Sequence, residues 1–563
     1  MPFAIDGDSI ALGKKGSFGA QHILVPKDGV AIHINAFNFP VWGMLEKVAV
    51  NWLAGMPAIV KPASSTSFLT QAVVKEIISS GILPAGALQL ITGSARGLLD
   101  HAEEGDVITF TGSASTGLKL KSNANVLSKS IPFNMEADSL NSSVLGQSIK
   151  RTDEEFDLFI KELRKEITVK SGQKCTAIRR IFVPEHLIDD VEHALIQSLQ
   201  KSTIGDPRVE GVRMGALVNQ KQKQDVEKKI EELLTESRCV FKQEDDIIGN
   251  NVDPGAFLGS HLLRQDSPMQ AKLVHEVEAF GPVSTLMPYR SMEEVIELVR
   301  KGKGSLCCSL VSTSESEARE FVHGASSMHG RILVLDRHCA SESTGHGSPL
   351  PLLVHGGPGR AGGGEEMGGV RGVHHYMQRT AIQGSPSMLT AISEKFQPGG
   401  RQTEATPHLF QQHFEDLVVG HCVFTAKHTV TEADIVNFAN VSGDHFYAHV
   451  DETSLEGTIF ERRVAHGYYL LSKAAGLFVD PKKGPVLLNY GIESARFTKP
   501  VYPGTTIGVK LTVQEKIEQE KKDDLDIRKG IVKFYVEIMD HENEHVGVAT
   551  ILTMVKFREQ EGK

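Results

Sequence analysis

The stretch KSGQKCTAIRR, residues 170–180, places Cys175 three residues after Gly172 and shortly before a strand candidate, RRIFVP, residues 179–184. A cysteine in such a position is more often a small buried hydrophobe than a nucleophile. The segments around Cys175 must therefore show which of the two it is. The same segments indicate the fold that carries it.

Upstream of this stretch, from Val25 to about Leu145, short apolar runs alternate with helical stretches. Such alternation is typical of repeated βαβ units on a parallel sheet. The runs are rich in Val and Ile without two-residue alternation, as expected where helices cover both faces. We therefore expect an α/β fold with a doubly wound nucleotide-binding sheet. The strand candidates are GVAIHINAF (29–37), PAIVKPA (57–63), ALQLITG (87–93), DVITFTG (106–112) and KSIPFNME (129–136), with helices over Trp42 to Ala54 and Thr70 to Ser80.

Downstream, longer amphipathic helices such as 154–167 and 219–234 continue the α/β pattern to about residue 390. Periodicity is lost in SEKFQPGGRQTEATPH, which predicts a linker. Two helix candidates and three β-rich runs follow, an order that fits one long helix wrapped by a curved antiparallel sheet. The expected domains are a cofactor-binding part at 1–149, a catalytic part at 150–392, the linker at 393–408 and a final domain at 409–563.

The chain has 563 residues, which indicates roughly three or four packed units at about 150 residues per domain. Lys and Arg number 60 against 70 Asp and Glu, and this net charge of −10 disfavours nonspecific attraction to nucleic acid or an anionic membrane. Six cysteines lack the paired spacing of a zinc site or a disulfide framework, so we expect no metal and a reducing compartment. The opening residues have no signal peptide, and no run approaches about 18 apolar residues. These features predict a soluble, cytoplasmic protein.

Five further segments join the cysteine stretch in the order and approximate spacing seen in aldehyde dehydrogenases, and the sequence resembles that family. They are FNFP, KPA, FTGSASTG, NMEADSLN and EAFGPV, which begin at residues 37, 61, 110, 134 and 278. The resemblance implies the aldehyde dehydrogenase fold, with Cys175 as the nucleophile that adds to the carbonyl. It also implies that Asn38 and the cysteine N–H stabilise the oxyanion, and that Glu136 is the general base for thioester hydrolysis.

The same resemblance implies a nicotinamide cofactor. Lys61 matches the lysine that bonds the adenosine ribose, and Glu278 matches the carboxylate on the nicotinamide ribose. Phe280 matches the neighbouring ring that packs on it. Each residue also has a plainer interpretation, as a surface charge or a core aromatic.

Backbone N–H groups around Gly112, Ser113 and Gly117 would meet the pyrophosphate at a helix start. NAD-selective members of the family tend to have a glutamate three residues after the lysine, whereas this chain has Ser64. A 2′-phosphate is therefore tolerated, and we expect NADP. The glycine-rich segment 346–369 resembles the C-terminal anchor of the family, or is a loop that needs positive φ angles.

Aldehyde dehydrogenases normally carry a long segment before the part that here begins at Met1. The resemblance therefore implies that the dehydrogenase half is N-terminally truncated. We expect its activity to be impaired if that segment is needed to cover an apolar face of the sheet.

In VSGDHFYAHVD, Asp444 and His449 lie five residues apart, where alone they would be ordinary surface groups. Together with VAHGYYLLSKAAGL and RFTKPVYPGTTI downstream, they resemble the MaoC-like, (R)-specific enoyl-CoA hydratases over about Phe410 to Phe557. The resemblance implies a hotdog fold in which Asp444 and His449 act on one shared water as base and acid. It places the N–H of Gly467 on the thioester enolate.

Two features bear on the substrate of this second half. The usual motif reads G-D-x-N-P-x-H, and Phe446 and Tyr447 replace its Asn and Pro, which favours a flat ring over a linear enoyl chain. CoA phosphates need cations despite the net charge of −10. The candidates are Arg462, Arg463, Lys482, Lys483, Arg496 and Lys499.

Taken together, the two halves resemble the bifunctional ring-opening enzymes of aerobic phenylacetate degradation. The resemblance implies that the C-terminal domain hydrolyses oxepin-CoA to 3-oxo-5,6-dehydrosuberyl-CoA semialdehyde, and that the N-terminal part oxidises this aldehyde with NADP. It implies a homo-oligomer built from dimers. Three alternatives stay open: a CoA hydratase on an inactive dehydrogenase scaffold, a dehydrogenase for another CoA semialdehyde, and a non-catalytic assembly component.

Overall fold

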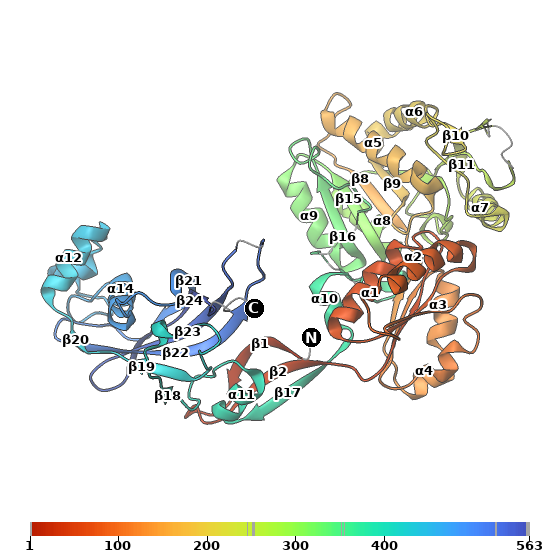
Figure 1. Cartoon of the computed structure of the whole chain (residues 1–563). Helices are drawn as coiled ribbons and strands as arrows, with labels where there is room; N and C mark the ends of the chain where they lie inside the picture. The colour runs from red at the N-terminus through yellow and green to blue at the C-terminus, as the bar shows by residue number, and fades with distance from the viewer. Residues whose placement is uncertain are drawn as a thin grey trace. The chain divides into compact units, whose positions relative to one another are not determined.

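The computed structural model describes residues 3–244, 246–249, 254–348, 350, 352–353, 355–366, 368–523 and 526–558. Its chain divides into two compact units (Figure 1). Unit 1 comprises Met1–Phe3 and Val25–Gln378, and unit 2 comprises Ala4–Leu24 and Arg379–Lys563. Among the described residues, no helix combines the length and the hydropathy that crossing a membrane requires.

Unit 1 contains a five-stranded parallel sheet of order β5-β4-β3-β6-β7. Buried side chains of α1 and α2 pack on one face, and those of α3 and α4 pack on the other. This is the doubly wound arrangement that the Val- and Ile-rich runs predict. The elements are β3 (Ala31–Ile34), α1 (Trp42–Ala54), β4 (Ala58–Lys61), α2 (Ser67–Ser79), β5 (Leu88–Leu90), β6 (Val107–Thr111), α3 (Ala114–Lys121), α4 (Ala124–Ser128) and β7 (Phe133–Glu136).

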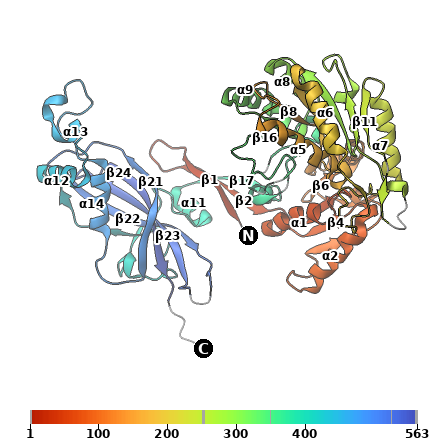
Figure 2. The same ribbon diagram turned by 90° about the horizontal axis from the view of Figure 1, so that it is seen from above.

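A seven-stranded sheet of order β11-β13-β14-β9-β8-β15-β16 forms the rest of the framework of unit 1. Its strands are parallel except for the β11–β13 pair. α5 and α6 pack on one face, and α7, α8 and α9 pack on the other (Figure 2). The elements are β8 (Asn141–Leu145), α5 (Glu154–Thr168), β9 (Ile178–Pro184), α6 (Ile188–Leu199), α7 (Gln220–Leu233), β11 (Arg238–Lys242), β13 (His261–Arg264), β14 (Val283–Tyr289), α8 (Met292–Arg300), β15 (Ser305–Val311), α9 (Glu315–Ala325) and β16 (His329–Leu335).

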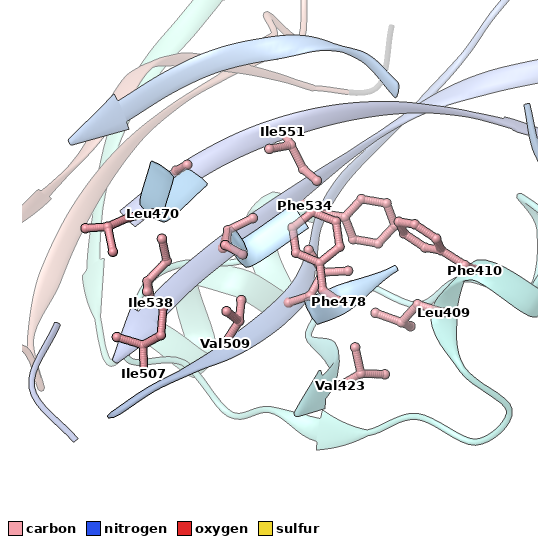
Figure 3. Close-up of a cluster of buried hydrophobic side chains, with 14 of the residues drawn as sticks. Leu409, Phe410, Val423, Leu470, Phe478, Ile507, Val509, Phe534, Ile538 and Ile551 are labelled. Carbon is pink, nitrogen blue, oxygen red and sulfur yellow. The ribbon is translucent and has the colours of Figure 1, made fainter. Parts of the chain in front are cut away.

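Unit 2 contains a sheet of order β18-β19-β22-β23-β24-β21, in which the four long strands pair antiparallel. The helix α14 packs on this sheet through a core that includes Leu470, Phe478, Phe534 and Ile538 (Figure 3). One long helix against a curved sheet is the arrangement predicted from the order of the runs. The elements are β18 (Thr403–Glu404), β19 (His421–Phe424), β20 (His428–Thr429), α12 (Glu432–Ser442), α13 (Tyr447–Val450), α14 (Gly467–Phe478), β21 (Val486–Phe497), β22 (Thr506–Glu518), β23 (Lys529–Met539) and β24 (His545–Lys556).

The segment 393–408, expected to be a linker, packs within unit 2. Phe396 is buried and lies 6.2 Å from Tyr535, measured between ring centroids. Thr403–Glu404 forms β18 and pairs with β19. The buried aromatic ring and the two paired strand residues hold in place a segment whose composition otherwise favours a loop.

Unit 2 also contains most of a three-stranded sheet that was not predicted from the sequence. Its strands are β1 (Ala4–Ala11), β2 (Gly19–Pro26) and β17 (Met377–Gly384), and α11 (Pro386–Ser393) follows β17.

Candidate active sites

Cys175 follows a kink in which three successive residues adopt left-handed backbone conformations. Lys170, Ser171 and Gly172 have φ angles of +52°, +54° and +69°. A Cβ on Gly172 would lie 2.1 Å from the carbonyl oxygen of Gly281, so only glycine fits there. The kink turns the chain out of α5 and toward the cysteine that precedes β9.

A buried amide holds the cysteine loop in place. Asn141 Nδ2 donates to the carbonyl oxygens of Cys175, at 2.8 Å, and Ala177, at 2.9 Å. Its Oδ1 accepts the Cys307 N–H at 3.0 Å and the Ser139 hydroxyl at 2.6 Å. Because the donors and acceptors of this amide are used, the backbone of Cys175 is fixed relative to β8 and β15.

A cavity of about 330 Å³, here called the aldehyde cavity, opens at the cysteine. Asn38, from the loop after β3, and Glu136, at the end of β7, line it together with Cys175. The Glu136 carboxyl accepts a hydrogen bond from Thr111 Oγ1 at 3.4 Å, and it lines the same cavity as the Cys175 thiol. The structure thus brings together the three residues that the motifs single out for aldehyde oxidation.

The electrostatics of the aldehyde cavity favour a base that titrates near neutrality. Burial raises the pKa of Glu136 to about 7, with Lys47 opposing and Glu366 adding to the shift. Burial also holds the pKa of the Cys175 thiol well above its usual range, and the Glu136 and Glu366 carboxylates contribute. A carboxylate poised near pH 7 beside a protonated thiol is suited to accept its proton.

Sequence reasoning missed three charged residues of this cavity, Glu46, Lys47 and Glu366. Lys47 Nζ lies 2.9 Å from Glu46 Oε1. Burial lowers the pKa of Lys47, but attraction to Glu46 and Glu136 outweighs that effect and the pKa is raised. Burial raises the pKa of Glu366 to about 7. The available signals were a charged pair inside the apolar helix 42–54 and an acidic pair within GGGEEMGG, residues 362–369.

Glu366 reaches the cavity because the described part of the glycine-rich segment packs against β7. Ala137 N–H donates to the Ala361 carbonyl at 2.9 Å. Asn134 exchanges two hydrogen bonds with the backbone of Glu365, at 2.7 and 3.0 Å. Gly362 has a φ of +112°, and a Cβ there would lie 2.2 Å from a β7 carbonyl oxygen. The glycines therefore permit a close approach of two backbones.

A second cavity, of about 840 Å³, is lined by Cys175 at the active site and by residues beyond the carboxyl ends of β3, β4 and β6. Doubly wound sheets bind nucleotides at this edge. Its lining includes five of the residues expected to hold the cofactor: Lys61, Gly112, Ser113, Glu278 and Phe280.

Glu278 offers a hydrogen-bond acceptor to this second cavity. Its Oε2 accepts the Ser139 N–H at 3.1 Å, and its Oε1 lies 3.6 Å from Arg179 Nε. Oε1 makes no hydrogen bond within the described structure although it is buried. Burial raises the pKa of Glu278 to about 7 against the opposing charge of Arg179. A buried carboxylate oxygen that makes no hydrogen bond fits a ligand hydroxyl such as that of a ribose, so the residues fit a dinucleotide.

Gly117 and Ser64 do not line this cavity. A Cβ on Gly117 would lie 2.8 Å from the Met135 sulfur, so this glycine lets α3 pack on the sheet instead. Ser64 begins an exposed turn beside Ala63, which does line the cavity. The first N–H of α3 is bonded to the Asp138 carboxylate at 2.8 Å.

In unit 2, Asp444 and His449 come together with a third residue, His466. Each offers a polar atom within 4.8 Å of the other two. His449 Nδ1 lies 2.6 Å from the Val464 carbonyl oxygen, and His466 Nε2 lies 2.9 Å from that of Asp444. Each imidazole donates one ring N–H to a backbone carbonyl, which fixes the orientation of the ring. The rings stack with centroids 3.7 Å apart. Sequence reasoning missed His466, although it directly precedes Gly467.

Gly467 is the first residue of α14, and a Cβ there would lie 2.2 Å from the Phe497 ring. The glycine therefore admits an aromatic ring from β21 to the start of the helix. Burial lowers the pKa of the neighbouring His466. That ring is thus a neutral neighbour for His449.

Two of the six basic residues expected to hold CoA are already paired with carboxylates. Arg463 is paired with two glutamates, and Lys499 is paired with an aspartate and a glutamate. These two charges are largely neutralised. The other four are exposed: Arg462, Lys482, Lys483 and Arg496.

Comparison with known proteins assigns both halves of the chain. Residues 4–382 match the model of the aldehyde dehydrogenase family, and residues 416–533 match that of the MaoC-like domain. The chain therefore belongs to the aldehyde dehydrogenase family. An aldehyde dehydrogenase domain fused to a MaoC-like domain is the arrangement of PaaZ-type enzymes, and the expected fold class is confirmed.

Two curated relatives are similar over large parts of their length. "Protein MaoC" of Klebsiella aerogenes is 50% identical over 312 residues, which are 55% of this chain and 91% of the relative. "3,4-Dehydroadipyl-CoA semialdehyde dehydrogenase" of Aromatoleum evansii is 42% identical over 355 residues, which are 63% of this chain and 69% of the relative.

Solved structures of the same fold include betaine aldehyde dehydrogenase from Staphylococcus aureus in complex with NAD+. It superposes with a TM-score of 0.58 at 20% identity and covers 68% of this chain and 71% of its own. This likeness shows the fold of unit 1.

Proposed function

We propose that this chain is a bifunctional enzyme that opens the ring of oxepin-CoA and oxidises the resulting semialdehyde with NADP. The observation that carries the proposal is the presence of two separate catalytic sets in one chain. Unit 1 gathers a thiol, a carboxyl and an amide around one cavity, and unit 2 gathers a carboxylate and two imidazoles. The matches to the aldehyde dehydrogenase and MaoC-like family models support this proposal.

In the first reaction, one water adds to the cyclic enol ether and the ring C–O bond breaks, which releases an aldehyde. Asp444 and His449 lie close enough to act on one water, with the carboxylate taking a proton and the imidazole giving one. The Val464 carbonyl fixes the orientation of the His449 ring. The aromatic Phe446 and Tyr447 beside this pair suit a flat heterocycle.

In the second reaction, aldehyde, water and NADP⁺ give carboxylate, NADPH and two protons. Glu136 accepts the Cys175 proton, and the sulfur adds to the carbonyl carbon. The Asn38 amide and the Cys175 N–H stabilise the oxyanion. The cofactor, when bound, would be held by Lys61, Glu278 and Phe280 and would supply the hydride acceptor. Loss of hydride from the adduct leaves a thioester on Cys175. Once Glu136 has released its proton to solvent, it activates the water that hydrolyses this thioester.

Two finer points concern the cofactor and the aldehyde. NADP is favoured over NAD because the chain has Ser64 in place of a glutamate that would repel a 2′-phosphate. Oxidation of 3,4-dehydroadipyl-CoA semialdehyde is a second candidate reaction for unit 1, since the relative from Aromatoleum evansii with that name is 42% identical. Both substrates are semialdehydes of CoA thioesters.

Single substitutions test whether the two activities use separate sites. Cys175→Ala and Glu136→Gln should abolish NADPH formation, by about a thousandfold or more, and spare ring opening. Asp444→Asn should abolish ring opening and spare oxidation of a supplied semialdehyde. Ring opening is followed by the ultraviolet absorbance of oxepin-CoA and oxidation by NADPH absorbance. Loss of both activities in each variant would contradict the proposal.

A further inference from the structure

The aldehyde cavity is lined by three carboxylates that surround the thiol. Glu46 comes from α1, Glu136 from β7 and Glu366 from the glycine-rich segment. Among the lining residues that the structure describes, Lys47 is the one cation. The three acids come from parts of the sequence that lie far apart, so their convergence is a property of the fold.

Lys47 is not free to bind an anionic ligand. Its side chain is 4% exposed, and Nζ lies 2.9 Å from Glu46 Oε1 and 3.3 Å from the Gly43 carbonyl oxygen. The ammonium charge is therefore neutralised inside the wall of the cavity. Glu136 and Glu366 then face the cavity without a further lining cation.

The groups behind Glu366 do not reverse this balance. His355 Nε2 lies 3.2 Å from a Glu366 oxygen, but burial lowers the pKa of His355, so the ring is neutral near pH 7. Arg331 acts on Glu366 from outside the lining and donates to the Ser348 carbonyl and the Cys307 sulfur. Lys170 is a further cation outside the lining, where its Nζ donates to the Asn38 carbonyl and lies 3.7 Å from the centroid of the Phe39 ring. The charged side chains of the described lining itself thus sum to neutral or negative.

We propose that these carboxylates select aldehydes by charge, an inference that rests on the proposed dehydrogenase function. The cavity accepts an aldehyde on an uncharged arm and rejects one that carries a carboxylate within a few carbons of the carbonyl. Like charges repel strongly in an enclosed site of low dielectric constant. The anionic part of the natural substrate therefore stays outside the cavity.

The same repulsion acts on the product. Oxidation converts a neutral aldehyde into a carboxylate within the cavity, where Glu136 and Glu366 already carry or share negative charge that Lys47, paired with Glu46, does not neutralise. A product that is bound less tightly than the substrate leaves more readily. The carboxylates that line the aldehyde cavity would thus both select the substrate by charge and favour release of the product.

Butanal and succinic semialdehyde test the inference, because both have four carbons and differ by the terminal carboxylate. With the full chain and NADP at pH 8, kcat/KM for butanal should exceed that for succinic semialdehyde by about tenfold or more. Glu46→Gln keeps the size of the side chain and an acceptor for Lys47 but removes one charge. It should shift the ratio toward succinic semialdehyde by about fivefold or more and tighten inhibition by butyrate.

The ratio of the two substrates cancels any general loss of activity in the variant. Glu315→Gln, on the exposed start of α9, is the matched control and should leave the ratio unchanged. Equal kcat/KM for the two aldehydes in the unmodified chain, or an unchanged ratio in Glu46→Gln, would overturn charge selection. Oxidation of neither aldehyde would contradict the proposed dehydrogenase function and the inference with it.

Discussion

The Cys175 thiol and the Glu136 carboxyl, which line one cavity, are the smallest unit of the proposed oxidation. Both groups are shifted toward their neutral forms because the cavity desolvates them. Because burial raises the pKa of Glu136, this carboxylate is a stronger base toward the thiol proton than an exposed glutamate would be. A base of this kind beside the thiol offers a route by which Cys175 can lose its proton as it attacks the carbonyl.

This pair predicts how oxidation depends on pH. Glu136 acts as a base only when it is ionised, and its pKa is about 7, so the active fraction grows as the pH rises through 7. Glu366, with a pKa of about 7 in the same cavity, titrates over the same range, so the rising limb reports both carboxyls. A profile of kcat for a supplied semialdehyde checks this expectation. A rate that stays constant from about pH 5.5 to 8 would contradict it.

Some residues of the aldehyde site lie in short sequence motifs and could be predicted, whereas others lie outside any motif and could not. Asn38, Glu136 and Cys175 each lie in a short motif, so their grouping is predictable from a family resemblance. Glu46 and Glu366 lie in no such motif. The sequence alone does not distinguish a glutamate on the surface from one that lines a cavity. Only the packing of the glycine-rich segment on β7 brings Glu366 to the thiol.

Among the elements, the start of α14 is the most tightly constrained part of the second site. A Cβ at Gly467 would collide with the Phe497 ring, which lies at the end of β21. Gly467→Ala should therefore destabilise unit 2 by about 1–3 kcal/mol. The temperature of half-inactivation of ring opening should fall, while that of semialdehyde oxidation should stay unchanged.

A second substitution separates collision from other causes. Phe497→Leu removes the ring edge, so the double variant Gly467→Ala with Phe497→Leu should recover part of the lost stability. If Gly467→Ala has the stability of the unmodified chain, the close approach of ring and helix is not a constraint.

At this scale the sequence predicted most strands and helices of the parallel sheets, because continuous Val- and Ile-rich runs are a strong local signal. It did not predict β1 and β2. The residues of β1 are half-buried or exposed, so they give no alternation of buried and exposed positions. β2 pairs with β1 in a hairpin, and its other neighbour β17 lies more than 350 positions away in the sequence.

At the scale of the whole chain, the sheet of unit 2 ends in an edge strand with exposed apolar side chains. β21 lies at one end of its sheet, and Leu488, Tyr490 and Ile492 are 48%, 56% and 55% exposed. An edge with exposed apolar side chains favours pairing with another chain. We therefore expect a homo-oligomer built from dimers.

Light scattering after size-exclusion chromatography tests this expectation. Leu488→Lys combined with Ile492→Lys should halve the mass of the dimer, whereas Val441→Lys, on the exposed face of α12, should leave it unchanged. A monomeric unmodified chain would contradict dimer formation.

At the scale of the chain, composition alone misjudged the boundary between the halves. The Pro- and Gly-rich segment 393–408 predicts a linker, yet Phe396 is buried in unit 2. Burial of the Phe396 side chain holds this segment against unit 2 although its composition is typical of a loop. The division into two catalytic units nevertheless follows from motifs that lie on either side of this segment.

The central claim is that one chain both opens the ring and oxidises the aldehyde so released. Purified chain supplied with oxepin-CoA and NADP should form one NADPH for each ring opened, and Cys175→Ala should open rings without forming NADPH. Ring opening by the unmodified chain with no NADPH, or NADPH formation from oxepin-CoA by Asp444→Asn at the full rate, would contradict the account.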